Sequence, residues 1–139
     1  PHKVLAFAAS NSRNSINKML VLHAANVLKE EVIPTADIRT IDLNDFEMPI
    51  YSIDREKESG IPQEAKNFYK EIGDADTLLI SYAEYNLHYQ SAFKNIVDWF
   101  DYGISTAENG QVLNESLIKS KEDFNMSAIC YDTYRAVLK

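Results

Sequence analysis

The chain has 139 residues, 45% of them hydrophobic and 25% charged, and a formal net charge of −7 at pH 7. This size and composition predict one globular domain, residues 1–139, with a single core. The acidic balance argues against a nucleic-acid partner, because phosphate backbones require basic faces. No apolar run is long enough to cross a membrane, so no membrane partner is expected. The single cysteine, Cys130, excludes an intramolecular disulfide and fits a cytoplasmic location.

The first part of the chain predicts a strand, a helix and a second strand. Residues 4–8 are apolar at every position, which is typical of a central parallel strand covered on both faces. Apolar residues at helical spacing predict a helix over residues 16–28, and Pro34 ends it soon afterwards. A second, weaker strand is predicted over residues 38–43. The apolar stripe of the helix consists of Ile16, Met19, Leu20, Ala24, Val27 and Leu28.

The alternation continues after a long connection, residues 44–60. Its charged run predicts a solvated surface, and its apolar piece, residues 48–51, could pack on a ligand, on a partner subunit or on the protein itself. A helix is predicted from Pro62 to Gly73. A strand, a loop and a further helix are predicted at 77–82, 83–89 and 91–102. Three strands alternating with three helices predict a parallel α/β sheet with right-handed crossovers. The predicted buried faces of these two helices are Ala65, Phe68, Tyr69 and Ile72, and Phe93, Ile96, Val97 and Phe100.

A loop rich in small polar residues separates the first predicted strand from the first predicted helix. The start of a helix presents free backbone N–H groups, and the helix dipole favours negative charge there. Hydroxyl and amide side chains add further donors, and an arginine adds a fixed cation. The loop over residues 9–15 is therefore predicted to bind phosphate. The candidate side chains are Ser10, Ser12, Arg13, Ser15 and Asn17.

Helix capping is the alternative for this loop, because serine and asparagine before a helix are ordinary N-caps. Capping accounts for one or two of these residues but not for three serines, three asparagines and an arginine so close together. The loop is neither a P-loop nor a dinucleotide fingerprint, since it lacks the glycine patterns of both. A mononucleotide phosphate is the ligand that this pattern favours.

A second loop, residues 83–90, follows the third predicted strand. Ligands of open parallel sheets bind beyond the carboxyl ends of the strands, so this loop is expected beside the first one. Tyr85 could lie against a flat ring, peptide N–H groups near Asn86 could bond its polar edge, and Glu84 could bind a ribityl or ribose hydroxyl. Alternatively, Tyr85 packs under the loop, Asn86 makes an Asx-type turn and Glu84 lies in water. No catalytic side chain, metal site or nucleophile elbow is predicted.

With both loops in view, the chain resembles the NAD(P)H-dependent FMN reductase family of flavodoxin-like proteins, which includes chromate, quinone and azo reductases. Residues 10–20 are similar to the family's phosphate loop and first helix, with Ala9 where the family usually has glycine. Residues 84–86 and 93–99 are similar to its Pro-Glu-Tyr-Asn loop and Lys-Asn-x-x-Asp-Trp helix, with Ala83 in place of the proline. The resemblance covers about residues 3–104.

The resemblance implies a flavodoxin-like, three-layer, doubly wound parallel sheet that binds FMN. It implies a hydride donor, NADPH or NADH, and a small electron acceptor such as a quinone, an azo compound, a metal oxyanion or free flavin. A homodimer or homotetramer is implied as well. A flavin-binding electron carrier or interaction module without NAD(P)H turnover is the alternative. The implied cofactor-binding residues are Ser10, Ser12, Arg13, Ser15, Ile16, Asn17, Glu84, Tyr85 and Asn86.

The pattern departs from the family after Ser105, because the fourth strand, a Gly-rich loop, a helix and the fifth strand do not follow in order. Residues 108–117 resemble the family's last loop and helix instead, and residues 126–131 could form one further strand before a short helix or tail. Part of the C-terminal half of the fold is therefore missing from the sequence, or the protein is shortened. A shortened protein would leave a sheet edge uncovered that a partner subunit could cover.

Overall fold

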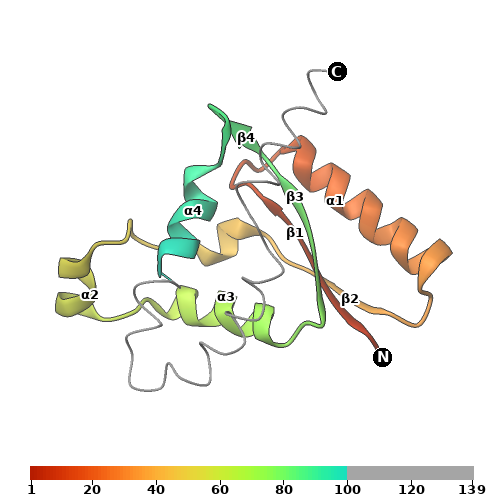
Figure 1. The fold of residues 1–139 in the computed structure, drawn as a ribbon, viewed down its shortest axis with the longest axis horizontal. Helices are drawn as coiled ribbons and strands as arrows, with labels where there is room; N and C mark the ends of the chain where they lie inside the picture. The colour runs from red at the N-terminus through yellow and green to blue at the C-terminus, as the bar shows by residue number, and fades with distance from the viewer. Residues whose placement is uncertain (100–139) are drawn as a thin grey trace.

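The computed structural model describes residues 1–99 (Figure 1). The strand, helix and tail expected at residues 100–139 lie outside the described residues. In chain order the elements are β1 (Lys3–Ala9), α1 (Ile16–Val27), the π-helical turn η1 (Leu28–Val32), β2 (Asp37–Thr40), the 3₁₀ helix η2 (Leu43–Phe46), α2 (Ile53–Ser59), α3 (Gln63–Gly73), β3 (Thr77–Tyr82), β4 (Glu84–Tyr85), β5 (His88–Tyr89) and α4 (Ser91–Asp98).

The main sheet has the strand order β2-β1-β3, and both pairs are parallel. The apolar strand β1 lies at its centre, which confirms the prediction for residues 4–8. Figure 1 shows α1 on one side of this sheet and α3 and α4 on the other. The chain therefore winds onto both faces of a parallel sheet, as the three-layer flavodoxin-like prediction requires.

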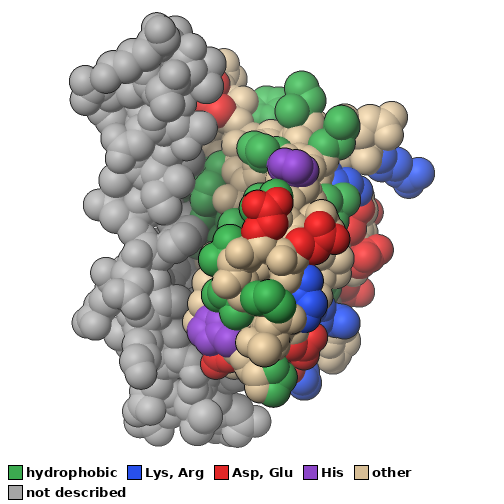
Figure 2. Space-filling model, turned by 90° about the vertical axis from the view of Figure 1, so that its right-hand side faces the viewer, with side chains coloured by type: hydrophobic (Ala, Val, Ile, Leu, Met, Phe, Trp, Pro, Cys, Tyr) green, Lys and Arg blue, Asp and Glu red, His purple; other side chains and the backbone are tan. Residues whose placement is uncertain are grey.

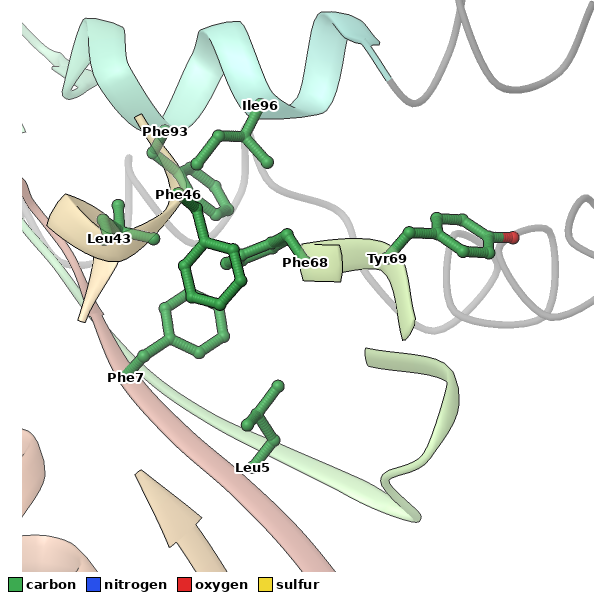
Figure 3. Packing of buried hydrophobic residues seen from close by; sticks show 9 residues of the cluster. Leu5, Phe7, Leu43, Phe46, Phe68, Tyr69, Phe93 and Ile96 are labelled. Carbon is green, nitrogen blue, oxygen red and sulfur yellow. The ribbon is translucent and has the colours of Figure 1, made fainter. Parts of the chain in front are cut away.

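Aromatic side chains fill the layer between the sheet and the α3/α4 side (Figure 3). The Phe68 ring meets Phe7 of β1 edge to face, with centroids 5.4 Å apart, and meets Phe46 of η2 in the same way at 5.1 Å. Phe93 of α4 closes the group. Such edge-to-face pairs add to the hydrophobic gain from burial. Of the predicted buried positions, Ala65, Phe68, Tyr69, Phe93 and Ile96 are buried, Ile72 and Val97 are partly buried, and Phe100 lies outside the described residues.

The opposite layer is built from small residues. Ala6 and Ala8 of β1 pack against Val21 and Ala25 of α1, because alternate strand residues point to opposite faces. Small side chains on both elements let the helix lie close to the sheet. Leu5 and Phe7, which alternate with these alanines, face the aromatic layer.

The apolar stripe predicted for α1 is wrong as a description of its buried face. Ile16 is 80% exposed, Met19 69% and Leu20 56%. The helix is apolar nearly all round, and the alanine face of β1 selects Val21 and Ala25 as its partners. The larger residues are left on the α1 side of the molecule, where Figure 2 shows hydrophobic side chains interspersed with charged ones.

One predicted boundary is wrong, and two elements were not predicted. β2 ends at Thr40 rather than at residue 43, because the Asp42 carboxylate caps η2 by accepting from the Asn44 backbone N–H at 2.9 Å. The loop predicted over 83–89 contains the antiparallel hairpin β4–β5. The long connection carries α2, which was not predicted, and the largely exposed charged run of this helix confirms the predicted solvated surface.

The apolar piece at residues 48–51 packs on its own protein, which was one of the three alternatives. Asn95 of α4 accepts from the Tyr51 backbone N–H at 2.8 Å and donates to the Pro49 carbonyl at 3.0 Å. The Trp99 indole donates to the same carbonyl at 2.8 Å, and its ring meets Tyr51 edge to face. Asn95 and Trp99 of the helix motif therefore hold this connection against α4, which is a structural role.

Candidate functional site

The two loops that carry the candidate residues leave the sheet side by side. Ala9 at the end of β1 pairs in register with Tyr82 at the end of β3. The chain moves from β1 outward to β2 on one side and returns to β3 on the other, so the two loops flank the point at which the winding reverses (Figure 1). Open α/β sheets bind ligands at such switch points.

The first loop is ordered by its own hydroxyl groups. The Ser10 Oγ accepts from the Ser12 backbone N–H at 3.2 Å, and the Ser15 Oγ accepts from the Asn17 N–H at 3.1 Å. Ser15 is the N-cap of α1, so the capping alternative is correct for this residue. Both hydroxyls use an acceptor lone pair in these bonds and keep an O–H group to donate.

Several donors of the same loop have no partner within residues 1–99. They are the backbone N–H groups of residues 13–16 and the guanidinium of Arg13. The N–H groups of Ser15 and Ile16 open the helix α1, where the helix dipole adds partial positive charge. A cluster of unused donors with a fixed cation and no carboxylate bonded to it has the chemistry of an anion site.

Asn17 is oriented by a residue that the sequence reasoning did not single out. The Ser81 hydroxyl, near the end of β3, donates to the Asn17 Oδ1 at 2.7 Å. With its oxygen engaged, the amide of Asn17 keeps its two Nδ2 hydrogens as donors. The sequence signal for Ser81 is a polar residue directly after the apolar run of residues 78–80.

The first helix turn is also anchored on the far side of the loop. Lys18 of α1 forms an ion pair with Asp42 just before η2. Partial burial acts to raise the pKa of Asp42, but hydrogen bonds from Lys18 and Asn44 outweigh this effect and hold the pKa below its ordinary value. Lys18 is thereby committed to a carboxylate, which leaves Arg13 as the cation of the loop within the described residues.

The second loop is a tight hairpin with an exposed tip. Asn86 and Leu87 have φ values of 51° and 68°, as the central residues of a type I′ turn require. The Glu84 carboxylate accepts from the Leu87 N–H, so the structure has a type I′ turn held by Glu84 where an Asx-type turn of Asn86 was the alternative. Tyr85 is 49% exposed, which contradicts the alternative that it packs under the loop.

The two loops are also joined directly. Gln90, at the start of α4, is buried, and its Oε1 accepts from the Asn11 backbone N–H at 2.7 Å. The structure thus brings the predicted residues of both loops to one end of the sheet. The Ile16 side chain is exposed, so only its backbone N–H is suited to bind an anion. Gln90 was not among the predicted site residues, and its only signal in the sequence is a polar side chain directly before a predicted helix.

Residues 1–99 contain neither a membrane-spanning helix nor a metal-binding group of side chains. No helix among them is long and apolar enough to span a membrane. No group of three or more histidine, cysteine, aspartate or glutamate side chains among them is arranged to hold a metal ion.

A parallel sheet in the order β2-β1-β3 with helices on both faces defines a flavodoxin-like α/β protein. Among solved structures, the chain is similar to FerB, a flavoenzyme NAD(P)H:(acceptor) oxidoreductase from Paracoccus denitrificans. The TM-score is 0.55 at 23% identity, over 80% of this chain and 54% of that chain. At this identity the likeness establishes the fold.

Residues 2–117 match the NADPH-dependent FMN reductase family, and the chain belongs to it. A probable NADPH:quinone oxidoreductase 2 of Oryza sativa is 33% identical over 97 residues, which are 70% of this chain and 46% of the relative. A 2-hydroxy-1,4-benzoquinone reductase of Burkholderia is 32% identical over 97 residues, 70% of this chain and 49% of the relative. The chain therefore spans about half the length of these curated relatives.

Proposed function

We propose that the protein is an FMN-dependent NAD(P)H oxidoreductase that passes electrons to a small acceptor. The observation that carries the proposal is the cluster of unused donors at residues 13–16, which lies beside the hairpin with its exposed Tyr85 at the switch point of the sheet. One loop suits a phosphate and its neighbour suits a flat ring. FMN carries both groups on one molecule.

The residues present fit this cofactor. The phosphate would accept from the backbone N–H groups of residues 13–16, including Ile16, and from the guanidinium of Arg13. Glu84, Tyr85 and Asn86 would border the ring. The hydroxyl and amide side chains that complete the phosphate site are Ser10, Ser12, Ser15 and Asn17.

When bound, FMN supplies the hydride and electron chemistry itself. The protein's part is to hold the two ends of the cofactor in place and to leave one ring face open to NADPH or NADH and then to the acceptor. This role requires no general acid or base, and no such side chain was predicted. Peptide N–H groups near Tyr85 and Asn86 would favour negative charge on the ring.

The acceptor class that we propose is a quinone, with an azo compound, a metal oxyanion or free flavin as the other small molecules of the same chemistry. The names of the Oryza and Burkholderia relatives, which act on quinones, support this order. We also propose assembly as a homodimer or homotetramer. Light scattering behind a sizing column tests the assembly independently of the chemistry.

The test begins with an absorption spectrum of the purified protein, before and after addition of FMN and desalting. Retained flavin absorbance is expected. Anaerobic addition of NADPH or NADH should then bleach the flavin bands, and a quinone should restore them. A chain that retains no FMN would overturn the proposal. A loaded chain that stays oxidised with both nucleotides would overturn the reductase function and leave an electron carrier.

A further inference from the structure

Gln90 connects the two halves of the site across a long stretch of sequence. Its side-chain Oε1 accepts the backbone N–H of Asn11 at 2.7 Å, although the two residues are 79 positions apart. Gln90 is only 8% exposed. Within the described chain, this is the one hydrogen bond between residues 10–14 and residues 83–90.

The side chain of Gln90 does not cap the helix that Gln90 precedes. Gln90 is the N-cap residue of α4, yet its side chain makes no hydrogen bond to that helix. Ser15 and Ser52, the N-caps of α1 and α2, do bond their own helices. Glutamine is not among the residues that favour N-caps. The amide is thus directed across the site while the start of α4 goes without a side-chain cap.

We propose that Gln90 is a positioning residue that sets the phosphate loop at the separation from the ring loop that FMN requires, a role that rests on the proposed function. The phosphate and the ring of FMN are joined by one linker, so both loops must present their donors at a matched distance. A hydrogen bond that fixes this distance before binding lowers the ordering cost of binding.

The same bond decides which donors of the first loop remain for a ligand. The Asn11 N–H is committed to Gln90, and the Ser12 N–H is committed to Ser10. The unused backbone donors therefore begin at Arg13 and run into α1. Loss of the Gln90 acceptor would free the Asn11 peptide to turn, and the loop would no longer hold one arrangement.

The sharpest variant is Gln90→Ser, because serine can cap α4 but is too short to reach Asn11. We expect stability in urea to stay constant or rise, while the Kd for FMN rises about tenfold. Riboflavin, which lacks the phosphate, should weaken by no more than about threefold. A loss of stability together with equal weakening of both ligands would show a merely structural role and overturn the proposal.

Amide hydrogen exchange in the cofactor-free chain tests the hydrogen bond itself. The Asn11 amide should exchange faster in Gln90→Ser, and in Gln90→Glu, which keeps an acceptor oxygen at the same reach, it should stay protected. Unchanged exchange in Gln90→Ser would overturn the proposal. This readout does not depend on FMN, so it separates the failure of the tether from the failure of the proposed function.

A double-mutant cycle with Arg13→Ala tests the link to the phosphate. If Gln90 sets the loop that carries Arg13, then Arg13→Ala should weaken FMN binding less in the Gln90→Ser background than in the wild-type chain. Additive effects would overturn the positioning role of Gln90. The proposed function would still stand if the wild-type chain binds FMN. A wild-type chain that binds no FMN would overturn both.

Discussion

The two faces of the central strand β1 carry different side chains and have different roles. On one face Phe7 meets the rings of Phe68 and Phe93, in a layer that also holds the 44–52 connection and α4. On the other face Ala6 and Ala8 bring α1 close to the sheet. The aromatic face holds the larger cluster of buried side chains, whereas the alanine face places the start of α1, with its unused donors, at the carboxyl end of β1.

From this difference we expect that stability and ligand binding can be changed separately in this protein. The fully buried side chains of Phe7, Phe68 and Leu5 belong to the aromatic side, and the predicted phosphate ligands belong to the loop that leads into α1. Changes in the aromatic layer should therefore alter the free energy of unfolding and leave ligand preference alone. Changes in the first loop should alter ligand binding, with a loss of stability only where a helix cap is removed.

The largest effect is expected from Phe68→Ala, because Phe68 is fully buried and touches both Phe7 and Phe46. The free energy of unfolding should fall by about 3–5 kcal/mol. The matched truncation on the other face, Val21→Ala, should lower it by about 1–2 kcal/mol. Urea titrations of both variants measure the contrast, and equal losses would remove the distinction between the two faces.

Arg13→Ala should weaken FMN binding by roughly 1.5–3 kcal/mol and leave riboflavin binding unchanged, because only FMN offers a phosphate to the guanidinium. Ser15→Ala should act in the same direction, with an added loss of stability of about 1 kcal/mol from the missing N-cap. Flavin fluorescence titrations with both ligands give the two affinities. The control is Arg39→Ala, which removes an arginine of β2 that pairs with Glu71 of α3. Equal losses for FMN and riboflavin would show that Arg13 and Ser15 do not contact phosphate.

Burial raises the pKa of Tyr69, in the aromatic layer, to about 12. The unfolded chain ionises this phenol near pH 10, so the folded state loses stability as the pH rises from about 10 to 12, and the stabilising effect is complete below about pH 10. Tyr69→Phe cannot ionise and should lose less stability over this window, by a difference on the order of 1–2 kcal/mol. Urea titrations of both proteins at about pH 9 and about pH 11.5 measure that difference. Parallel pH profiles would contradict the burial of the phenol.

The smallest effect is expected from Leu87→Gly at the tip of the hairpin. Leu87 holds a φ of 68°, a conformation that a leucine adopts at an energetic cost and a glycine adopts readily. The change should stabilise the protein by about 0.5–1 kcal/mol in urea titrations. Leu87→Ala is the control, since alanine keeps the strain. If glycine and alanine behave alike, the strain at this turn does not limit stability.

The three strands of the main sheet, the helices α1, α3 and α4 and the positions of the two loops could be predicted from the sequence alone, whereas α2 and the β4–β5 hairpin could not. The unbroken apolar run of residues 4–8 could only suit a strand covered on both faces, and it lies at the centre of the sheet. The serines before α1 and the polar residues after β3 marked two loops that the parallel register places side by side. Local pattern is enough for such features, because periodicity and capping are properties of short segments.

Packing between elements, in contrast, decided which face of α1 is buried, because this helix is apolar nearly all round and takes its orientation from the alanines that β1 presents to it. It also decided that Asn95 and Trp99 hold residues 48–51 and that Gln90 reaches Asn11. Contacts between residues 44 to 79 positions apart leave no periodic trace in the sequence. They depend on packing between elements, which a reading of single segments does not contain.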